Sequence, residues 1–295
     1  MSARGLGTWL RALRVHQWSK NVLIFLPAAG AHRLFEHAAA LQSMTAFLVF
    51  SCCASGTYLL NDLMDLDADR LHPTKRNRPF ASGQLPLTHG FFVAPVLVGG
   101  GLLLGALLLG RLFFATLAAY VVCTVWYTRS LKRFAMVDAL MLAGLYALRV
   151  VGGAAATAII PSFWLLAFTM FLFLSLAMAK RYSELMLMIT SGRTHAAGRG
   201  YVTEDAPLLQ ACGVASGYIS VLVIALYVNS AVAQSMYRRP EALWLLCPLL
   251  LYWVTRVWLK TSRGRMDDDP VVFALRDRPS LAVACVGLLL IWAAV

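Results

Sequence analysis

Apolar runs of about twenty residues recur along the chain and constrain its fold more than any other feature. A helix needs about 20 apolar residues to cross the hydrocarbon core of a bilayer. We expect nine spans, at 21–40, 42–61, 88–109, 112–128, 136–158, 162–180, 210–233, 241–260 and 280–295. Because 60% of the 295 residues are hydrophobic and only 14% are charged, too few polar side chains remain to coat a soluble globule of this size. The sequence therefore predicts an all-α polytopic membrane protein that forms one domain over 1–295.

The first of these segments is the least regular. We expect a span that is short, broken or ends in the interface, because this segment contains Pro27, His32, Arg33, Glu36 and His37. Residues 1–20 are basic and aromatic and lack a secretory cleavage site, so we expect the N-terminus to be retained. The six cysteines lie in apolar runs without a CxxC pattern, which favours buried free thiols over a disulfide framework or a zinc site.

The basic residues indicate an orientation. Most of the 26 Lys and Arg residues lie in the N-terminal tail and in the loops after the second, fourth, sixth and eighth spans. By the positive-inside rule this side faces the cytoplasm. We therefore predict an integral protein of a bacterial inner membrane with a cytoplasmic N-terminus. The net charge of +12 then suits anionic lipid headgroups and requires no nucleic acid.

Charge is concentrated in the stretch "LLNDLMDLDADRLHPTKRNRPFASG" (59–83). Asp62, Asp65 and Asp69 are spaced three and four apart, so on a continuous helix they share one face, while Asp67 points elsewhere. Carboxylates that repel one another in this way persist when a hard cation neutralises them. Mg²⁺ is the natural candidate, because it takes one or two protein carboxylates together with substrate phosphates. We predict that Asp62, Asp65 and Asp69 form a catalytic metal site in the cytoplasmic loop 62–87.

Basic residues follow these acids directly. Arg70, Lys75, Arg76 and Arg78 cannot bind a metal but can hold phosphate oxygens through charge-assisted hydrogen bonds. Acids for a metal beside bases for phosphate indicate a site for a phosphorylated substrate. The alternative is a solvated helix end whose acids and bases pair with one another.

Further charged groups lie at the same membrane face. Tyr127 and Lys132 belong to "WYTRSLKR", and Lys180, Arg181 and Glu184 belong to "AMAKRYSEL". Cations at these helix ends are also explained as groups that fix the topology of the protein.

Three other charged features allow more than one interpretation. Arg149 lies about halfway along a span, where an ionisable residue usually faces a cavity or a partner, and Asp138 is three turns away. Lys20 in "RVHQWSKN" is by itself an ordinary interfacial anchor. The run 267–269 is three aspartates, which we interpret as a solvated turn.

The quoted stretch contains NDxxDxxxD followed by DRxHPxKxxRPxASG, and it resembles the UbiA superfamily of intramembrane prenyltransferases. Within that superfamily the chain is most similar to the decaprenyl-phosphate phosphoribosyltransferase group. The similarity extends through "RVHQWSKNVLIFLP", "YTRSLKR", "DALMLAGLYALRVVGG", "KRYSEL" and "DPVVFALRDRPS". The resemblance implies nine transmembrane helices around a central cavity that is open to lipid.

The resemblance also implies an activity. We expect an Mg²⁺-dependent glycosyltransferase that moves 5-phosphoribosyl from 5-phosphoribosyl-1-diphosphate to a polyprenyl (decaprenyl-type) phosphate. Diphosphate would be released, and the product would serve cell-envelope arabinan or related lipid-linked sugars. The implied substrate-binding residues are Lys20, Asn61, Arg70, Lys75, Arg78, Tyr127, Lys132, Lys180, Arg181 and Glu184. Glu184 would hold either ribose hydroxyls or a metal-bound water, and the oligomeric state stays open, a homo-oligomer included.

One departure from the prenyltransferase pattern favours the phosphoribosyl donor. Superfamily members that ionise a prenyl diphosphate carry a second Asp-rich motif at the end of the sixth span. Here that place reads "KRYSEL", with one acid and two cations, which suits a donor with an additional phosphate.

Three alternatives remain. The first is transfer of a prenyl group from a diphosphate to an aromatic acceptor in a quinone or haem pathway, which uses the same first motif. The second is a transporter, although no inverted hydropathy repeat is apparent and the charges crowd one membrane face. The third is a scaffold with a degenerate site, which is disfavoured because every acid of the first motif is present.

Overall fold

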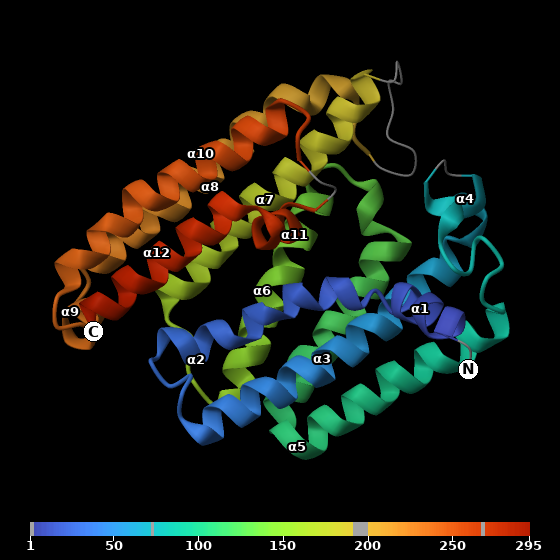
Figure 1. Ribbon diagram of the computed structural model, residues 1–295, viewed down its shortest axis with the longest axis horizontal. Helices are drawn as coiled ribbons and strands as arrows, with labels where there is room; N and C mark the ends of the chain where they lie inside the picture. The colour runs from blue at the N-terminus through green and yellow to red at the C-terminus, as the bar shows by residue number, and fades with distance from the viewer. Residues whose placement is uncertain (1–2, 72–73, 191–199, 267–268) are drawn as a thin grey trace. The chain divides into compact units, whose positions relative to one another are not determined.

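The computed structural model describes residues 3–71, 74–190, 200–266 and 269–295, and over these residues the regular structure is helical (Figure 1). The α-helices are α1 (Ala3–Ala12), α2 (Leu26–Gly30), α3 (His37–Met64), α4 (Leu66–Leu71), α5 (Leu87–Arg129), α6 (Val137–Thr157), α7 (Phe163–Thr190), α8 (Ala206–Val228), α9 (Ala231–Met236), α10 (Leu246–Ser262), α11 (Pro270–Arg276) and α12 (Arg278–Ala294). The 3₁₀ helices are η1 (Val15–Phe25), η2 (Lys75–Asn77), η3 (Leu131–Arg133), η4 (Thr203–Asp205) and η5 (Pro240–Leu245).

The chain forms two compact units. Unit 1 consists of Met1–Arg129 and Leu148–Pro161, and unit 2 of Ser130–Ala147 and Ser162–Val295. The helix α6 therefore gives its first half to unit 2 and its second half to unit 1. The expectation of a single domain stays a prediction.

Within the described ranges, six helices are long and apolar enough to cross a membrane, or seven if α11 and α12 are counted as one span bent by 78°. The all-helical membrane architecture is therefore confirmed, whereas the count of nine is not. One difference arises because α5 covers two of the expected segments, with a break at Gly110, where φ is positive. A Cβ placed on Gly105 would lie 3.1 Å from the Phe113 ring. A straight helix would separate two residues eight positions apart by about 12 Å along its axis. The helix α5 is thus a tight helical hairpin that contains both segments.

The first expected span, 21–40, is not one helix. Its residues are divided among η1, α2 and the start of α3, with non-helical residues 31–36 between the last two. Pro27 lies at the second position of α2, where a proline is compatible with the start of a helix. His32 adopts a positive φ, a left-handed conformation that cannot continue α2. The expectation of a broken segment is correct, and that of a span extending to residue 40 is wrong.

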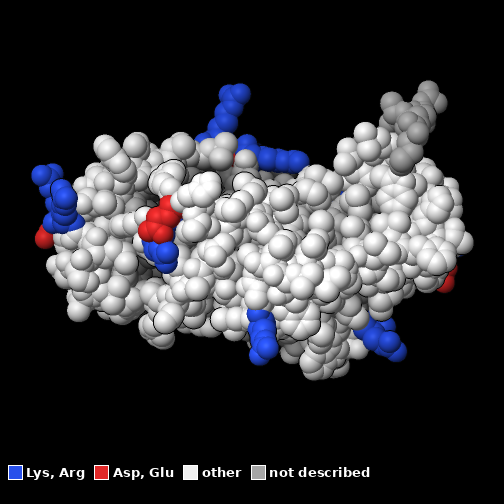
Figure 2. All heavy atoms as spheres, turned by 90° about the horizontal axis from the view of Figure 1, so that it is seen from below, with Lys and Arg blue, Asp and Glu red and all other residues white. Residues whose placement is uncertain are grey.

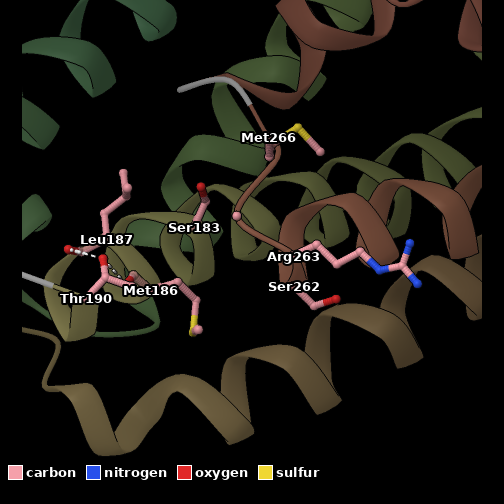
Figure 3. Close-up of a pocket in the computed structure, with 8 residues that line it drawn as sticks. Ser183, Met186, Leu187, Thr190, Ser262, Arg263 and Met266 are labelled. Atoms are coloured by element: carbon pink, nitrogen blue, oxygen red, sulfur yellow. Dashed lines mark hydrogen bonds between the residues drawn. The ribbon is translucent and has the colours of Figure 1, made fainter.

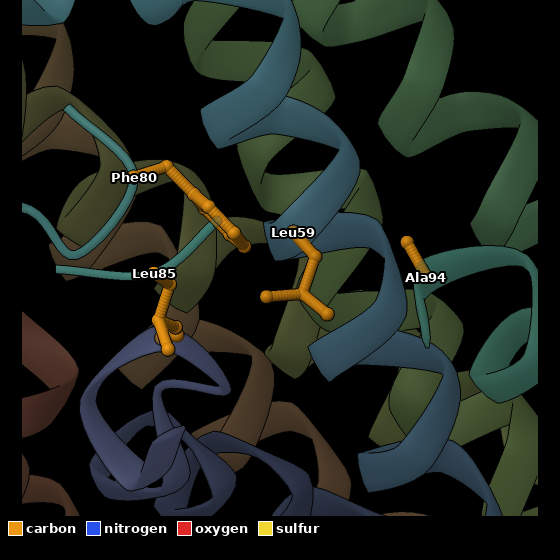
Figure 4. Close-up of a cluster of buried hydrophobic side chains, with 5 residues drawn as sticks. Leu59, Phe80, Leu85 and Ala94 are labelled. Carbon is orange, nitrogen blue, oxygen red and sulfur yellow. The ribbon is translucent and has the colours of Figure 1, made fainter. Parts of the chain in front are cut away.

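The core of unit 1 fixes the loop that follows the Asp-rich motif. α3 packs along α5, and the buried side chains of Ala12, Leu59, Phe80, Leu85 and Ala94 meet at one end of this pair (Figure 4). Phe80 and Leu85 come from the loop, and Phe80 is 1% exposed. Burial of a phenylalanine side chain contributes about 1.5–3 kcal/mol, so this contact holds the loop against the end of α3.

In unit 2, α7 and α8 lie side by side and α10 packs against both (Figure 1). The Trp258 indole nitrogen on α10 donates a hydrogen bond of 3.0 Å to the Ser175 hydroxyl on α7, which in turn donates one of 2.7 Å to the carbonyl of Gly213 on α8. A Cβ on Gly213 would overlap the Trp258 ring, so glycine is required for this three-helix contact.

The surface is largely apolar. On the face shown in Figure 2, Lys, Arg, Asp and Glu occupy isolated spots among other residues. Large hydrophobic side chains such as Leu107, Leu112 and Trp292 are mostly exposed on the long helices. Exposed apolar surface of this extent requires a nonaqueous neighbour, which the hydrocarbon of a bilayer supplies.

Candidate active site

Two buried carboxylates of the Asp-rich motif converge on one guanidinium. Asp62 and Asp69 are each 2% exposed. Arg78 Nη1 lies 3.0 Å from Asp62 Oδ1 and 2.5 Å from Asp69 Oδ2. Arg78 comes from the loop that Phe80 anchors, so the packing described above also places this cation between the two acids.

The four acids of the motif differ in environment. The expectation that Asp67 points elsewhere is confirmed, because its carboxylate is exposed and lies 3.8 Å from Arg70. Asp65 is half-buried and lies between the end of α3 at Met64 and the start of α4 at Leu66. The motif thus gathers Asp62 and Asp69, and it does not bring Arg70 to them. Asn61, next to Asp62 at the end of α3, is half-buried.

Arg14 joins this cluster, and sequence reasoning assigned it no role there. Its Nη2 donates a hydrogen bond of 2.5 Å to Asp62 Oδ1, the same oxygen that Arg78 contacts. Its guanidinium also lies 5.0 Å from the centroid of the Tyr58 ring, a cation–π distance. Arg14 precedes η1 in a left-handed backbone conformation, which is rare in residues other than glycine. A basic residue upstream of "WSKN" carried no signal that could separate it from an interfacial anchor.

A second network in unit 1 surrounds Arg149. Its Nε donates a 2.9 Å hydrogen bond to Asn21 Oδ1, and Asn21 Nδ2 donates one of 2.9 Å to Ser51. Arg149 Nη2 lies 3.2 Å from the Tyr120 hydroxyl, and the guanidinium stacks over the rings of Tyr120 and Phe50. The expectation that an arginine within a span faces partners is therefore confirmed.

In unit 2, Arg181 is the most buried of the predicted cations. It is 1% exposed, and its Nε lies 2.5 Å from Asp138 Oδ2. Its Nη1 donates to both oxygens of Glu184, at 2.8 and 2.7 Å. The carboxylate of Asp138 comes from α6, 43 residues earlier in the chain, so the sequence offered no spacing from which to predict this pair.

The last aspartate of the run 267–269 corrects the interpretation as a solvated turn. Residues 267 and 268 lie outside the described ranges, but Asp269 is only 7% exposed. Its Oδ2 lies 3.4 Å from Lys180 Nζ, and its Oδ1 lies 3.5 Å from the Tyr146 hydroxyl. It also caps α11, because Oδ1 accepts a hydrogen bond of 3.1 Å from the Val271 amide. The sequence did not indicate this burial, since an aspartate before proline is equally common in exposed turns.

Carboxylates from other segments therefore balance the basic residues of "KRYSEL" in the folded protein. Asp138 and Asp269 bring two carboxylates to Lys180 and Arg181 in addition to Glu184. This cluster of unit 2 combines cations for phosphate with acceptors for hydroxyl groups.

The remaining predicted residues are less informative in position. Lys20 is 9% exposed, and Lys75, Tyr127 and Lys132 are half-buried. Each of these four side chains interacts with other groups of the protein. We keep their assignment to phosphate binding as a prediction.

A cavity of about 320 Å³ lies in unit 2 between the ends of α7 and α10 (Figure 3). It is lined by Ser183, Met186, Leu187, Thr190, Ser262, Arg263, Gly264 and Met266. None of the predicted substrate-binding residues lines it, so we do not assign the substrate to this cavity.

Asp62 and Asp69 fit a divalent cation. Their oxygens already enclose a positively charged nitrogen from two sides, and two carboxylates with substrate phosphates are the ligands that Mg²⁺ uses. Among the described residues, no group of three or more His, Cys, Asp or Glu is placed to hold a metal ion by itself. A metal here would complete its coordination with water molecules or phosphate oxygens.

Comparison with known proteins identifies the class. A model of the UbiA prenyltransferase family matches residues 22–273. The chain belongs to this family, and its long apolar helices are those of an integral membrane protein.

Several relatives support this assignment. The chain is 37% identical over 273 residues to the uncharacterized protein y4nM of Sinorhizobium fredii, covering 92% of this chain and 53% of that protein. It is 36% identical over 288 residues to the nodulation protein NoeC of Azorhizobium caulinodans, covering 96% and 91%. It is 37% identical over 187 residues to a decaprenyl-phosphate phosphoribosyltransferase of Mycobacterium tuberculosis, covering 62% of each chain. The match thus spans about half the length of the first relative and less than two thirds of the third.

Solved structures agree on the fold. A UbiA homologue from Archaeoglobus fulgidus, solved with GPP and Mg²⁺, superposes with a TM-score of 0.70 and 16% identity over 96% of this chain and 99% of that one. A digeranylgeranylglyceryl phosphate synthase superposes with a TM-score of 0.67 and 14% identity over 99% and 98% of the two chains. At these identities the likeness establishes the fold alone.

Proposed function

We propose that this protein transfers 5-phosphoribosyl from 5-phosphoribosyl-1-diphosphate to a polyprenyl phosphate and releases diphosphate. The observation that carries the proposal is the 37% identity to the mycobacterial decaprenyl-phosphate phosphoribosyltransferase. The acceptor would be a decaprenyl-type phosphate, and the product a lipid-linked sugar for a cell-envelope polymer.

The residues of unit 1 supply the leaving-group chemistry in this proposal. Asp62 and Asp69, with Asp65 beside them, would hold Mg²⁺, which stabilises the negative charge that develops on the departing diphosphate. Arg78, already at these carboxylates, and Lys75 and Lys20 would donate to the diphosphate oxygens.

The residues of unit 2 have the chemistry of a phosphorylated sugar. Lys180 and Lys132 would serve as cations for phosphate oxygens. The carboxylates of Glu184 and Asp269 would accept hydrogen bonds from ribose hydroxyls, which a prenyl donor lacks. The pairing of Arg181 with Asp138 and Glu184 fixes the position of Glu184 in this arrangement.

The acceptor requires no strong general base. A phosphate monoester dianion is already a nucleophile, so its oxygen can attack the ribose C1 as the bond to diphosphate lengthens. Catalysis would then depend on orientation and on stabilisation of charge in the transition state. The basic loops would face the cytoplasm, where the donor is soluble.

The test is a pair of transfer assays on purified protein in detergent with Mg²⁺. One tube holds labelled 5-phosphoribosyl-1-diphosphate and a polyprenyl phosphate, and the other holds a labelled prenyl diphosphate and 4-hydroxybenzoate. We expect labelled lipid only in the first tube. Asp62→Asn should abolish it, while Asp67→Asn, at the exposed acid of the same motif, should not. Product only in the second tube would overturn the proposal and favour an aromatic prenyltransferase.

A further inference from the structure

We infer that Arg14 exchanges partners when the diphosphate binds, leaving Asp62 to the metal ion and moving to a phosphate oxygen. The inference rests on the proposed use of Mg²⁺ and a diphosphate, and it adds Arg14 to the residues that bind the substrate.

Two guanidiniums compete for one oxygen. Arg14 Nη2 and Arg78 Nη1 lie 2.5 and 3.0 Å from Asp62 Oδ1. Mg²⁺ would approach a carboxylate oxygen to about 2.0–2.1 Å. Asp62 is almost fully buried, and three positive groups around one oxygen repel one another strongly where water screens little. At least one arginine must therefore withdraw when the metal binds.

Arg14 is the arginine that is free to withdraw. Arg78 also lies 2.5 Å from one oxygen of Asp69, Oδ2, so it can keep a carboxylate contact if the metal binds Asp69 through the other oxygen. In the part of the chain that the structure describes, Asp62 is the one acid that Arg14 contacts. The Tyr58 ring, 5.0 Å from the Arg14 guanidinium, offers a surface along which the side chain can move without losing a favourable contact.

The backbone of Arg14 favours the same change. Its left-handed conformation is costly for a residue with a Cβ, and such strain persists only where other contacts hold it. The ion pair with Asp62 is the strong contact of this residue. Once the metal takes Asp62, the residue before η1 is released from that constraint and its side chain can reorient.

A phosphate oxygen is the natural second partner. A guanidinium presents planar paired donors that match phosphate oxygens, and a metal held by Asp62 and Asp69 would keep a diphosphate within reach of the same side chain. Arg14 would therefore weaken the binding of the metal alone and strengthen the binding of the metal with diphosphate.

These opposite effects distinguish exchange from a structural role. We would measure Mn²⁺ binding from the paramagnetic resonance signal of the free ion, and inorganic diphosphate binding by calorimetry in excess Mg²⁺. For Arg14→Gln we expect Mn²⁺ to bind at least about threefold tighter and diphosphate about tenfold more weakly. Arg14→Gly serves as a second variant, because glycine adopts the left-handed conformation of this position without strain.

The matched control is Arg11→Gln. Arg11 lies one turn earlier, is exposed and donates to Gln84 at 2.8 Å, so both affinities should equal those of the wild type. Unchanged or weaker Mn²⁺ binding in both Arg14 variants would overturn the inference, as would wild-type Mn²⁺ binding that Asp62→Asn leaves intact. Because neither measurement uses a ribosyl donor or a lipid acceptor, the inference can hold even if the transfer assay fails.

Discussion

Gly153 of α6 lies directly against the backbone carbonyl of Ile24 in η1, so closely that a Cβ on Gly153 would overlap the carbonyl oxygen. Neither backbone segment can move far without disturbing the other, because Ile24 is fully buried and Val150, one turn earlier in α6, is buried too. This contact holds the irregular first segment of unit 1 in place, and with it the neighbouring Asn21.

Gly153→Ala should therefore destabilise the protein. The added methyl cannot be accommodated by a side-chain rotation, since the neighbouring atoms are backbone, and overpacking of this kind typically costs about 1–3 kcal/mol. Gly144→Ala is the control, because this glycine lies in the same helix with nothing within 4 Å of an added Cβ. Thermal unfolding in detergent should show a lower midpoint for Gly153→Ala alone; equal midpoints would contradict the packing.

Arg149→Lys should also lower stability, although it keeps the positive charge. Lysine cannot reproduce the hydrogen bonds to Asn21 and Tyr120, and bonds of charged groups contribute about 1.5–3 kcal/mol. In a double-mutant cycle with Asn21→Ala we expect a coupling of about 0.5–3 kcal/mol. Arg33→Lys, at an exposed ion pair with Glu36, should cost less than about 1 kcal/mol. Additive effects at 149 and 21 would argue against the network.

Asp269→Asn should separate binding from folding. Asparagine caps a helix as well as aspartate does, so α11 should persist, but the negative charge beside Lys180 is lost. If Lys180 and Asp269 bind the donor as proposed, the KM for 5-phosphoribosyl-1-diphosphate should rise about tenfold, the equivalent of one charge-assisted hydrogen bond. Asp67→Asn should leave it unchanged. A lower midpoint of thermal unfolding with an unchanged KM would instead show that Asp269 serves only the fold.

Tyr201→Phe should alter the response to alkaline pH. The Tyr201 hydroxyl accepts a 2.9 Å hydrogen bond from the Met136 amide, and burial raises the pKa of this phenol. A raised pKa means that the unfolded chain loses the proton first, so the stability contributed by Tyr201 is complete below about pH 10 and declines as the pH rises further. At neutral pH the free energy of unfolding of the variant should be about 1 kcal/mol lower than that of the wild type. The difference in free energy of unfolding between the variant and the wild type should become smaller above about pH 10. A difference that does not change with pH would contradict this.

The sequence predicted well what depends on local spacing. Asp62 and Asp69, seven positions apart, are both buried, although the break between α3 and α4 separates them, while Asp67 points away. Hydropathy located the long helices, because a run of apolar residues reports directly on lipid contact. The two spans expected at 88–109 and 112–128 correspond to the two parts of α5 on either side of Gly110.

What could not be predicted depends on contacts between distant segments. Asp138 and Arg181, or Lys180 and Asp269, become neighbours only when separate helices pack, and no periodicity reports such a pairing. Arg14 was missed for the same reason, since its acid is 48 residues away. The first span was placed wrongly because hydrophobicity does not distinguish a continuous helix from a 3₁₀ segment and a short helix in series.

The attachment of α11 sets an order for biosynthesis. Asp277, between α11 and α12, accepts hydrogen bonds from Arg256, Lys260 and Ser280. These bonds hold the C-terminal end of α11, the short helix that Asp269 caps. A ribosome completes residues 62 to 78 before it reaches 269 and 277. The acid beside Lys180 is therefore synthesised after Lys180 itself, so a nascent chain with α3 to α10 already inserted would still lack it.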